Sequence, residues 1–206
     1  MISIEAINLG KKYGTNRLFK NFSFSFTQNQ HYCITGINGS GKSTFLLTLC
    51  GYITPTEGKI VWKNNNAVIE NPIGFFSYTS PALELFEHLS LIEILKHHAA
   101  FCQTFNLENA LDEIENMGLK KSLNKQVSSF SSGMKQRVKL IMALYNDVPV
   151  ILLDEPCSNL DDIGLAQYNH LLHTRESKSM FLVATNQPVT EFPVNGKTLN
   201  LDDFKK

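Results

Sequence analysis

The sequence predicts an α/β fold in which helices cover a mainly parallel sheet. Two unbroken apolar runs, residues 150–153 and 180–184, are typical of central parallel strands that are buried on both faces. A third strand, residues 32–35, leads into a glycine-rich loop, and an apolar helix over residues 44–50 follows and ends at Gly51. This succession of strand, loop and helix supports the α/β class.

The composition limits the kind of protein that the chain can be. Its 206 residues are 43% hydrophobic and 18% charged, and 19 basic side chains balance 19 acidic ones. Such a chain is globular rather than disordered, and we expect one domain over residues 1–206. Because the formal net charge is zero, a nucleic-acid binder that acts through bulk positive charge is excluded.

Membrane insertion and disulfide bonding are also not expected. The sequence has no run of about 20 apolar residues that would span a bilayer. Residues 1–5 do not resemble a secretory signal, so we expect a cytoplasmic protein. The four cysteines are far apart and form no CxxC pattern, which favours structural roles for Cys33, Cys50, Cys102 and Cys157.

The N-terminal third is predicted to be rich in strands. Phe22, Phe24 and Phe26 alternate with serines, and this period of two indicates a half-buried strand. After the apolar helix, turn residues separate short strand candidates. These candidates are residues 59–62, 67–70 and 73–78.

A helical insertion is predicted over about residues 81–145. Ser90 and Glu93 have the spacing of a capping box, and Asn106 can cap a further helix that stops at Gly118. Another helix has one apolar face, formed by Met134, Val138, Ile141 and Tyr145.

The strongest motif is the glycine-rich loop GINGSGKST at residues 36–44, which fits the P-loop pattern GxxxxGK[ST]. Its glycines let backbone N–H groups point at phosphate oxygens, and the helix N-terminus adds a partial positive charge. Lys42 is expected to reach the β- and γ-phosphates, and Ser43 to bind Mg²⁺. A chance glycine-rich turn is the alternative. The expected ligands of a nucleotide are Gly36, Asn38, Gly39, Ser40, Gly41, Lys42, Ser43 and Thr44.

Two carboxylates, Asp154 and Glu155, end the apolar run at residues 150–153. Adjacent residues of an extended strand point to opposite faces, so the two carboxylates must have different roles. We expect Asp154 to hold Mg²⁺ through its water shell and Glu155 to polarise the attacking water. The alternative is a strand that merely ends in acidic loop residues.

Several motifs in one order give a resemblance to the ABC-type ATPase family. Residues 130–134 read FSSGM where that family has LSGGQ, and Ser131 and Gly133 match this signature. Tyr13 lies where the family stacks an aromatic ring on adenine. The matching motifs are Tyr13, the P-loop, the signature, the Walker B residues Asp154, Glu155 and Pro156, and the D-loop residues Ser158, Asn159, Leu160 and Asp161. The chain looks most similar to small cassettes of exporters, including the haem-exporter and antibiotic-exporter branches.

The resemblance implies a P-loop NTPase with an N-terminal antiparallel β-subdomain. It also implies an ATP-binding and ATP-hydrolysing subunit of a membrane transporter, with ATP and Mg²⁺ as ligands. In this family two cassettes pair head to tail, so Ser131, Gly133, Ser158 and Asp161 are expected to contribute to nucleotide binding. The implied partners are a second ABC ATPase subunit, identical or different, and an integral membrane permease. The permease would hold the chain at the cytoplasmic face of the membrane.

Two positions of the family pattern are not met. No glutamine occurs between Gln30 and Gln103, so the Q-loop position, near Ser80 or Pro81, lacks its glutamine. Asn186 follows the last predicted strand where the family has its switch histidine. Because asparagine can donate a hydrogen bond to the γ-phosphate, we expect Asn186 to act in catalysis. Because it carries no positive charge, we expect hydrolysis to be slow.

Other functions stay open on the sequence alone. One is a non-catalytic regulatory nucleotide-binding module that pairs with another cassette. Another is a soluble ABC-type ATPase of translation or DNA maintenance, although such relatives usually carry two fused cassettes or a long coiled coil. A simple P-loop kinase would need neither the FSSGM segment nor the D-loop. Phenylalanines near Phe86 are candidates for a groove that receives a permease segment, with core packing as the alternative.

Overall fold

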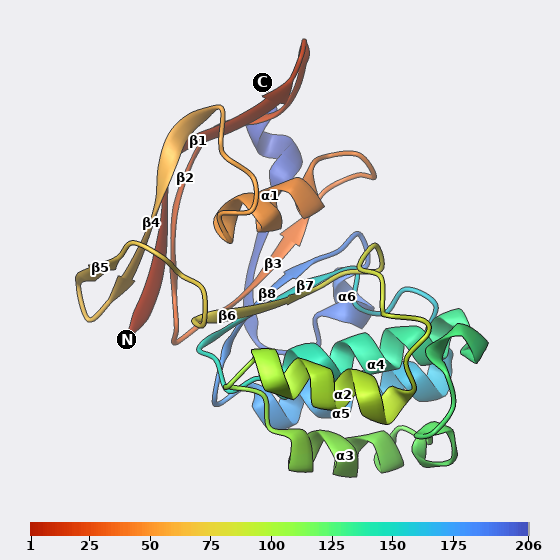
Figure 1. The fold of residues 1–206 in the computed structure, drawn as a ribbon. Helices are drawn as coiled ribbons and strands as arrows, with labels where there is room; N and C mark the ends of the chain where they lie inside the picture. Colours follow the sequence, from red (N-terminus) through yellow and green to blue (C-terminus); the bar gives the residue numbers. More distant parts are fainter. Residues whose placement is uncertain (206) are drawn as a thin grey trace.

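The computed structural model describes residues 1–205, and its elements are arranged in layers (Figure 1). An antiparallel sheet lies on one side, a parallel sheet crosses the middle, and helices cover the other side of that sheet. The first helix, α1, lies between the two sheets. The layers follow from the sequence, because each apolar face needs another element against which it can be buried.

The antiparallel sheet has the strand order β2-β1-β4-β5. The predicted strand around Phe22, Phe24 and Phe26 is confirmed, with Phe22 and Phe26 buried and Phe24 half-buried. Asn8 and Asn21 have left-handed backbones (φ 49° and 52°) where the register between β1 and β2 shifts, as expected for a bulge. The bounds are Ile2–Tyr13 for β1, Asn16–Thr27 for β2, Glu57–Asn64 for β4 and Ala67–Ile69 for β5.

The second sheet has the order β6-β7-β8-β3-β9, and its strand pairs are parallel. The bounds are His31–Thr35 for β3, Phe76–Thr79 for β6, Val150–Asp154 for β7, Met180–Ala184 for β8 and Gly196–Asn200 for β9. All residues of β7 and β8 are buried, which confirms the interpretation of the two apolar runs as central strands.

Successive side chains of β7 enter two different hydrophobic cores. Val150 and Leu152 pack with α1 and the antiparallel sheet, whereas Ile151 and Leu153 pack with the helices on the opposite face. The same alternation holds in β8, as the period of two along a strand requires. The parallel sheet therefore separates an aromatic-rich core from a core formed largely by helices.

The helices of the insertion begin at the predicted caps. Ser90 and Glu93 form the expected capping box at the start of α2. The Asn106 side chain accepts a hydrogen bond from the Asn109 amide at 3.0 Å at the start of α3, and Gly118 follows this helix with φ 72°. The bounds are Lys42–Leu49 for α1, Leu91–Phe101 for α2, Leu107–Asn116 for α3, Ser132–Leu144 for α4, Asp162–Arg175 for α5 and Pro188–Glu191 for α6. Short 3-10 helices are Lys120–Ser122 (η1), Val127–Ser129 (η2) and Leu201–Phe204 (η3).

Some boundaries differ from the sequence prediction. The strand predicted over residues 73–78 begins only at Phe76, because the chain turns before it. Asn71 accepts a hydrogen bond from the Ile73 amide at 3.1 Å, and Gly74 is left-handed with φ 88°. Helix α1 begins two residues earlier than predicted, at Lys42, since the P-loop itself closes its first turn. Within residues 1–205, no helix has both the length and the apolar character needed to cross a membrane.

Candidate active site

The phosphate-binding loop lies between β3 and α1, where the sequence predicts it. Gly41 is left-handed (φ 97°) at the start of α1, and a side chain there would be both strained and crowded. A Cβ atom built on Gly41 would lie 3.0 Å from the Cβ of Leu18 in β2. Glycine therefore lets β2 approach the loop closely. Tyr13 pairs with Asn16 at the turn of the hairpin that β1 and β2 form.

The Lys42 side chain folds back over the P-loop. It is 5% exposed, and its ammonium group donates to the carbonyl oxygens of Gly36 at 3.0 Å and Ile37 at 3.3 Å. The hydroxyl of Ser40 is buried and has no hydrogen-bond partner among residues 1–205. A buried hydroxyl without a partner, in the same loop as a buried cation, is a fitting environment for the oxygens of a phosphate.

Asp154 ends β7 and is 4% exposed. Burial raises the pKa of its carboxyl group, while a hydrogen bond with Ser43 opposes this rise. Ser43 and Asp154 thus lie together, as expected for two residues that share Mg²⁺. One carboxylate oxygen, Asp154 Oδ1, is buried without a hydrogen-bond partner in the described chain. Oxygen donors of this kind suit Mg²⁺, so the residues present fit this ion.

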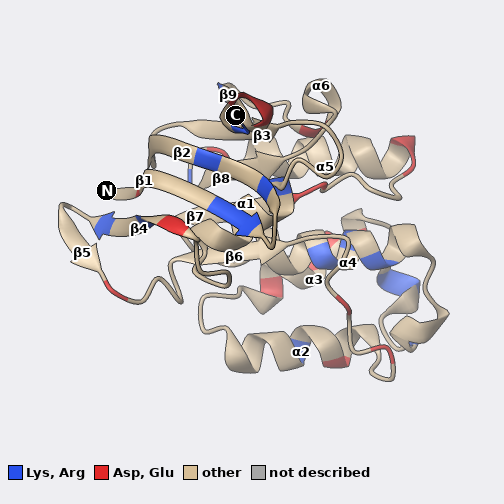
Figure 2. Cartoon of the chain, turned by 90° about the horizontal axis from the view of Figure 1, so that it is seen from above, with Lys and Arg blue, Asp and Glu red and all other residues tan. Residues whose placement is uncertain are grey.

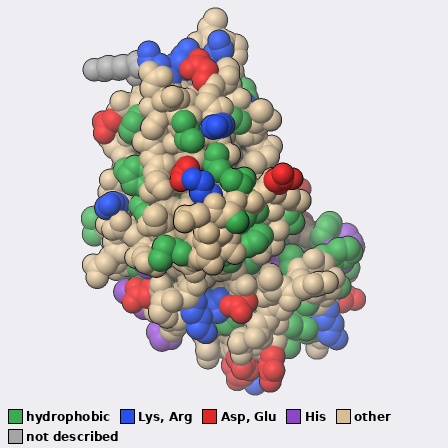
Figure 3. All heavy atoms as spheres, turned by 90° about the vertical axis from the view of Figure 1, so that its left-hand side faces the viewer, with side chains coloured by type: hydrophobic (Ala, Val, Ile, Leu, Met, Phe, Trp, Pro, Cys, Tyr) green, Lys and Arg blue, Asp and Glu red, His purple; other side chains and the backbone are tan. Residues whose placement is uncertain are grey.

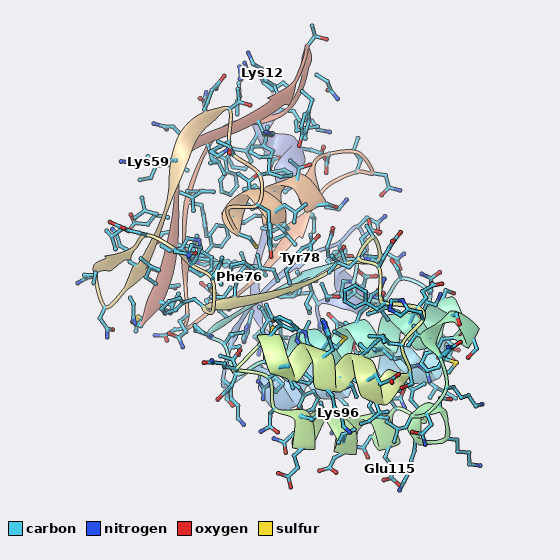
Figure 4. The ribbon with its side chains drawn as sticks, viewed as in Figure 1. Lys12, Lys59, Phe76, Tyr78, Lys96 and Glu115 are labelled. Atoms are coloured by element: carbon cyan, nitrogen blue, oxygen red, sulfur yellow. The ribbon has the colours of Figure 1, made fainter. Side chains whose placement is uncertain are left out.

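Tyr78 is a neighbour of this carboxylate that the sequence analysis missed. It lies in β6, next to β7 (Figure 4), and its hydroxyl donates to Asp154 Oδ2 at 3.4 Å. Thr79 and Ser80 are 2% and 3% exposed, and Ser80 and Pro81 are where the sequence analysis expects the Q-loop to lack its glutamine. Short hydroxyl side chains and a phenol therefore occupy the region next to the Asp154 carboxylate.

Glu155 occupies a strained turn directly after β7. Its φ angle is 43°, which is uncommon for a residue other than glycine, and its amide donates to the carbonyl of Ala184 in β8 at 2.8 Å. Glu155 lines a cavity of about 380 Å³ together with the D-loop residues Ser158 and Asp161 and with Asn186. The proposed base, the D-loop and the switch position thus face one space.

Asn186 is connected to the P-loop. Its side-chain amide donates to Asn38 Oδ1 at 2.9 Å, although 148 residues separate the two positions. The switch position is therefore next to the loop expected to bind phosphate. Nothing in the local sequence signals this contact, because it depends on β3 and β8 being adjacent in the sheet.

Glu191, at the end of α6, lines the same cavity and was also missed. It is 6% exposed, and Tyr168 donates to its backbone carbonyl at 2.8 Å. Burial raises the pKa of this carboxyl group, and the nearby charges of Glu155 and Asp154 raise it further. An acidic residue in the last turn of a short helix gives no signal of burial in the sequence.

The signature residues Ser131 and Gly133 lie at the start of α4, and Gly133 approaches the D-loop of its own chain. Ser131 caps the helix by accepting a hydrogen bond from the Met134 amide at 3.2 Å. A Cβ atom on Gly133 would lie 2.7 Å from the carbonyl oxygen of Asn159, so only glycine permits this approach. Arg137 of the same helix contacts Asp161 at 2.5 Å. This ion pair ties the signature helix to the D-loop.

A P-loop that opens a helix, together with a parallel strand that ends in Asp154 and is followed by Glu155, defines the class of P-loop nucleotide-binding proteins. The family model described as ABC transporter matches residues 19–158, which include the P-loop, the signature and the Walker B residues. The chain therefore belongs to the ABC transporter family, and the resemblance and the fold class predicted from the sequence are confirmed.

Relatives and solved structures agree with this assignment. The ABC transporter ATP-binding protein YybJ of Bacillus subtilis (strain 168) is 30% identical over 195 residues, which cover 89% of this chain and 84% of YybJ. The cytochrome c biogenesis ATP-binding export protein CcmA of Pseudomonas aeruginosa is 30% identical over 191 residues, 89% of this chain and 92% of CcmA. A bacterial ABC transporter cassette, solved as a dimer, has the same fold with a TM-score of 0.81 at 22% identity, over 96% of this chain and 94% of that cassette.

Proposed function

We propose that the chain binds ATP with Mg²⁺ and hydrolyses it, as the ATPase subunit of a membrane transporter. The observation that carries this proposal is the arrangement of Ser43, Asp154 and Glu155 next to a complete P-loop. Membership of the ABC transporter family supports it. Its relative CcmA is an export protein by name, which favours the exporter branch over the other branches of the family.

Each residue has a distinct role in the proposed reaction. Lys42 would exchange its two carbonyl partners for the β- and γ-phosphates, and backbone amides of the P-loop would orient the phosphate chain. Ser43 and Asp154 would hold Mg²⁺, which supplies positive charge to the phosphate oxygens. Glu155 would accept a proton from the attacking water, and Asn186 would donate a hydrogen bond towards the γ-phosphate. Tyr13 would stack on the adenine ring.

The test is phosphate release by the purified chain and by Glu155→Gln. We expect this substitution to lower hydrolysis at least about 100-fold, because the amide cannot accept the proton, while ATP still binds. Glu70→Gln, which changes an exposed carboxylate of the same type, is the control and should hydrolyse normally. Equal hydrolysis by Glu155→Gln and the unchanged chain would reject Glu155 as the base. Binding of ATP without any hydrolysis by the unchanged chain would favour a regulatory module.

One proposed partner of the chain is another ABC ATPase subunit, which would bind head to tail. The N-terminus of α4, with Ser131 and Gly133, would then contact the γ-phosphate held by the other subunit, and Ser158 and Asp161 would line the interface. The related cassette solved as a dimer supports this arrangement. In light scattering with ATP and Mg²⁺, Glu155→Gln should double its mass, and Ser131→Arg introduced into that variant should remain monomeric.

A cleft between the sheets and the helical insertion supports the proposed membrane permease as a partner. It has a volume of about 800 Å³ and lies between β6 on one side and α2 and α4 on the other. Its rim includes exposed apolar side chains, with Ile73 at 75% and Phe101 at 77% exposure. Figure 3 shows hydrophobic side chains exposed on this side of the molecule. Phe86, the residue proposed from the sequence, is not one of the residues that line this cleft; it is 55% exposed and packs edge-on against His97.

The charge distribution also favours a protein partner over a nucleic acid. Lys and Arg residues are interspersed with Asp and Glu residues in the view of Figure 2, and the two kinds are equal in number.

To test the cleft as the permease contact, the tagged chain is incubated with detergent-solubilised membranes of its source and recovered through its tag. Recovery of a multi-spanning protein should be lost in Phe101→Asp and retained in Val68→Asp, whose side chain is 64% exposed on β5. Equal recovery by the two variants would place the permease contact elsewhere. Such a contact would hold the chain at the cytoplasmic face of the membrane.

A further inference from the structure

The C-terminal segment reaches the first turn of the P-loop. Strand β9 runs parallel to β3, and their last paired residues are Thr35 and Asn200. The P-loop begins directly after one strand and the 3-10 helix η3 directly after the other. The Asp202 carboxylate oxygen Oδ2 therefore lies next to the loop and accepts a hydrogen bond from the Ile37 amide at 2.8 Å. This contact joins positions that are 165 residues apart.

Ile37 is held at both of its backbone groups. Asp202 binds its N–H group, and the Lys42 ammonium group binds its carbonyl at 3.3 Å. Asp202 also lies against Gly36, since a Cβ atom built there would be 3.2 Å from Oδ2. A lysine that turns to a phosphate has to leave the Ile37 carbonyl. When Lys42 has turned away, the hydrogen bond between the Ile37 amide and the Asp202 carboxylate still holds the Ile37 backbone.

Asp202 is itself fixed in place. Lys205 approaches its other oxygen to 2.6 Å, and Asn200 accepts a hydrogen bond from its amide at 3.1 Å. On either side of it, Leu201 is buried at 1% exposure and the Phe204 ring packs 4.6 Å from Phe22. A carboxylate anchored in this way imposes a position on its partner rather than following it.

We propose that Asp202 is a positioning residue of the nucleotide site, which holds the first turn of the P-loop in the shape that receives phosphate. The inference rests on the proposed function, because it needs a nucleotide at this loop. The negative charge of Asp202 opposes nucleotide binding, because a carboxylate repels a nearby phosphate. The hydrogen bond and the charge therefore predict opposite results for the removal of Asp202, and a pair of variants separates them.

The experiment compares Asp202→Ala with Asp202→Asn, by calorimetric titration with MgADP, which binds without turnover. We expect Asp202→Ala to weaken MgADP binding about 10-fold, because a hydrogen bond to a charged acceptor is lost. Asp202→Asn keeps an oxygen acceptor and should remain within about 3-fold of the unchanged chain. Asp203→Ala is the control, because it removes an exposed carboxylate from the same short helix.

Amide hydrogen exchange at Ile37, measured by NMR without nucleotide, reports on the contact itself. Protection should be lost in Asp202→Ala and kept in Asp202→Asn and Asp203→Ala. Tighter or unchanged MgADP binding by Asp202→Ala, or equal weakening in both Asp202 variants, would overturn the inference and leave the proposed function in place. Failure of the unchanged chain to bind MgADP would instead overturn the proposed function.

Discussion

Asn186 lies at the position where the sequence analysis expects the switch histidine of the family. Its side chain is neutral and donates its amide hydrogen to Asn38 in the P-loop at 2.9 Å. A histidine side chain at this position can be positively charged and lie near the γ-phosphate. Such a charge stabilises the transition state more than the ground state, because negative charge develops on the phosphate oxygens. In the proposed reaction, Asn186 would therefore connect the loop after β8 to the P-loop but would add no positive charge near the γ-phosphate.

We predict that Asn186→His raises the hydrolysis rate about 10-fold, because a charged donor is about twice as strong as a neutral one. The measurement is steady-state phosphate release at saturating ATP. Asn186→Ala is the matched control and should hydrolyse more slowly than the unchanged chain. A rate for Asn186→His at or below that of the unchanged chain would show that the loop is built around asparagine.

Glu191 is a carboxylate whose environment disfavours its charge. It is buried in the cavity shared with Glu155, and its Oε2 atom has no hydrogen-bond partner in the described part of the chain. Burial and the nearby Glu155 and Asp154 raise its pKa above the ordinary value of 4.5. The folded state therefore binds this proton more tightly than the unfolded state does. The resulting stabilisation is complete below pH 4.5 and is lost as the pH rises through the folded-state pKa.

For this reason we predict that Glu191→Gln stabilises the chain at pH 8 more than at pH 5. The amide is neutral at both values, so it avoids the ionised carboxylate that burial penalises at the higher pH. The measurement is the melting temperature of both proteins at each pH. Glu70→Gln, at an exposed position, should change little at either pH. A difference that is the same at both pH values would contradict the prediction.

At the scale of elements, α4 and the D-loop form one connected unit. Gln136, which is 1% exposed, donates to the Pro156 carbonyl at 2.8 Å, and Gly133 approaches the Asn159 carbonyl. The turn that carries the proposed base is therefore joined to the helix expected to face the partner's nucleotide. A displacement of one element has to displace the other, because their polar groups are paired.

We predict that Gly133→Ala destabilises the chain by about 1–3 kcal/mol, since its methyl group would displace the D-loop backbone. Hydrolysis should fall while MgADP binding is retained, because the P-loop lies in another part of the chain. Chemical denaturation, phosphate release and calorimetry give the three readouts. Ser132→Ala, at an exposed neighbouring position of α4, should behave as the unchanged chain. Equal loss of MgADP binding would place the effect in the P-loop.

At the scale of the molecule, the parallel sheet divides two cores of different character. The core on the side of α1 contains a cluster of aromatic rings, in which Phe22 lies 4.7 Å from Phe45 and 4.6 Å from Phe204. These rings come from β2, from the P-loop helix and from the C-terminal 3-10 helix. Aromatic packing thus joins three segments next to the proposed nucleotide site.

We predict that Phe22→Ala lowers the free energy of unfolding by about 3–5 kcal/mol, because the ring is 1% exposed and its removal leaves a cavity. Phe22→Leu should cost less than about 2 kcal/mol, since most of the volume is kept. Urea unfolding measures both values. Phe101→Ala removes the same side chain at 77% exposure and should change stability by less than about 0.5 kcal/mol. Similar losses at both positions would contradict the burial of Phe22 in this aromatic core.

Local patterns in the sequence predict local structure well in this chain. The runs that became β7 and β8, the cap residues Ser90 and Asn106, and the P-loop all depend on residues close in the chain. The start of β6 was misplaced because an apolar residue, Ile73, stands in a turn. The contacts of Tyr78 with Asp154 and of Asp202 with Ile37 span 76 and 165 residues. Strand order creates such contacts, and strand order leaves no local pattern.

Trp62 gives the chain a built-in optical reporter. It is the single tryptophan of the sequence, it is 3% exposed on β4, and its indole N–H donates to the Leu49 carbonyl at 2.9 Å. Leu49 ends α1, the helix that begins with Lys42. An indole in such a dry, hydrogen-bonded setting should emit at short wavelength. Any shift of the P-loop helix should therefore change the intrinsic fluorescence of the protein, so that the arrival of a ligand can be followed in real time without a dye.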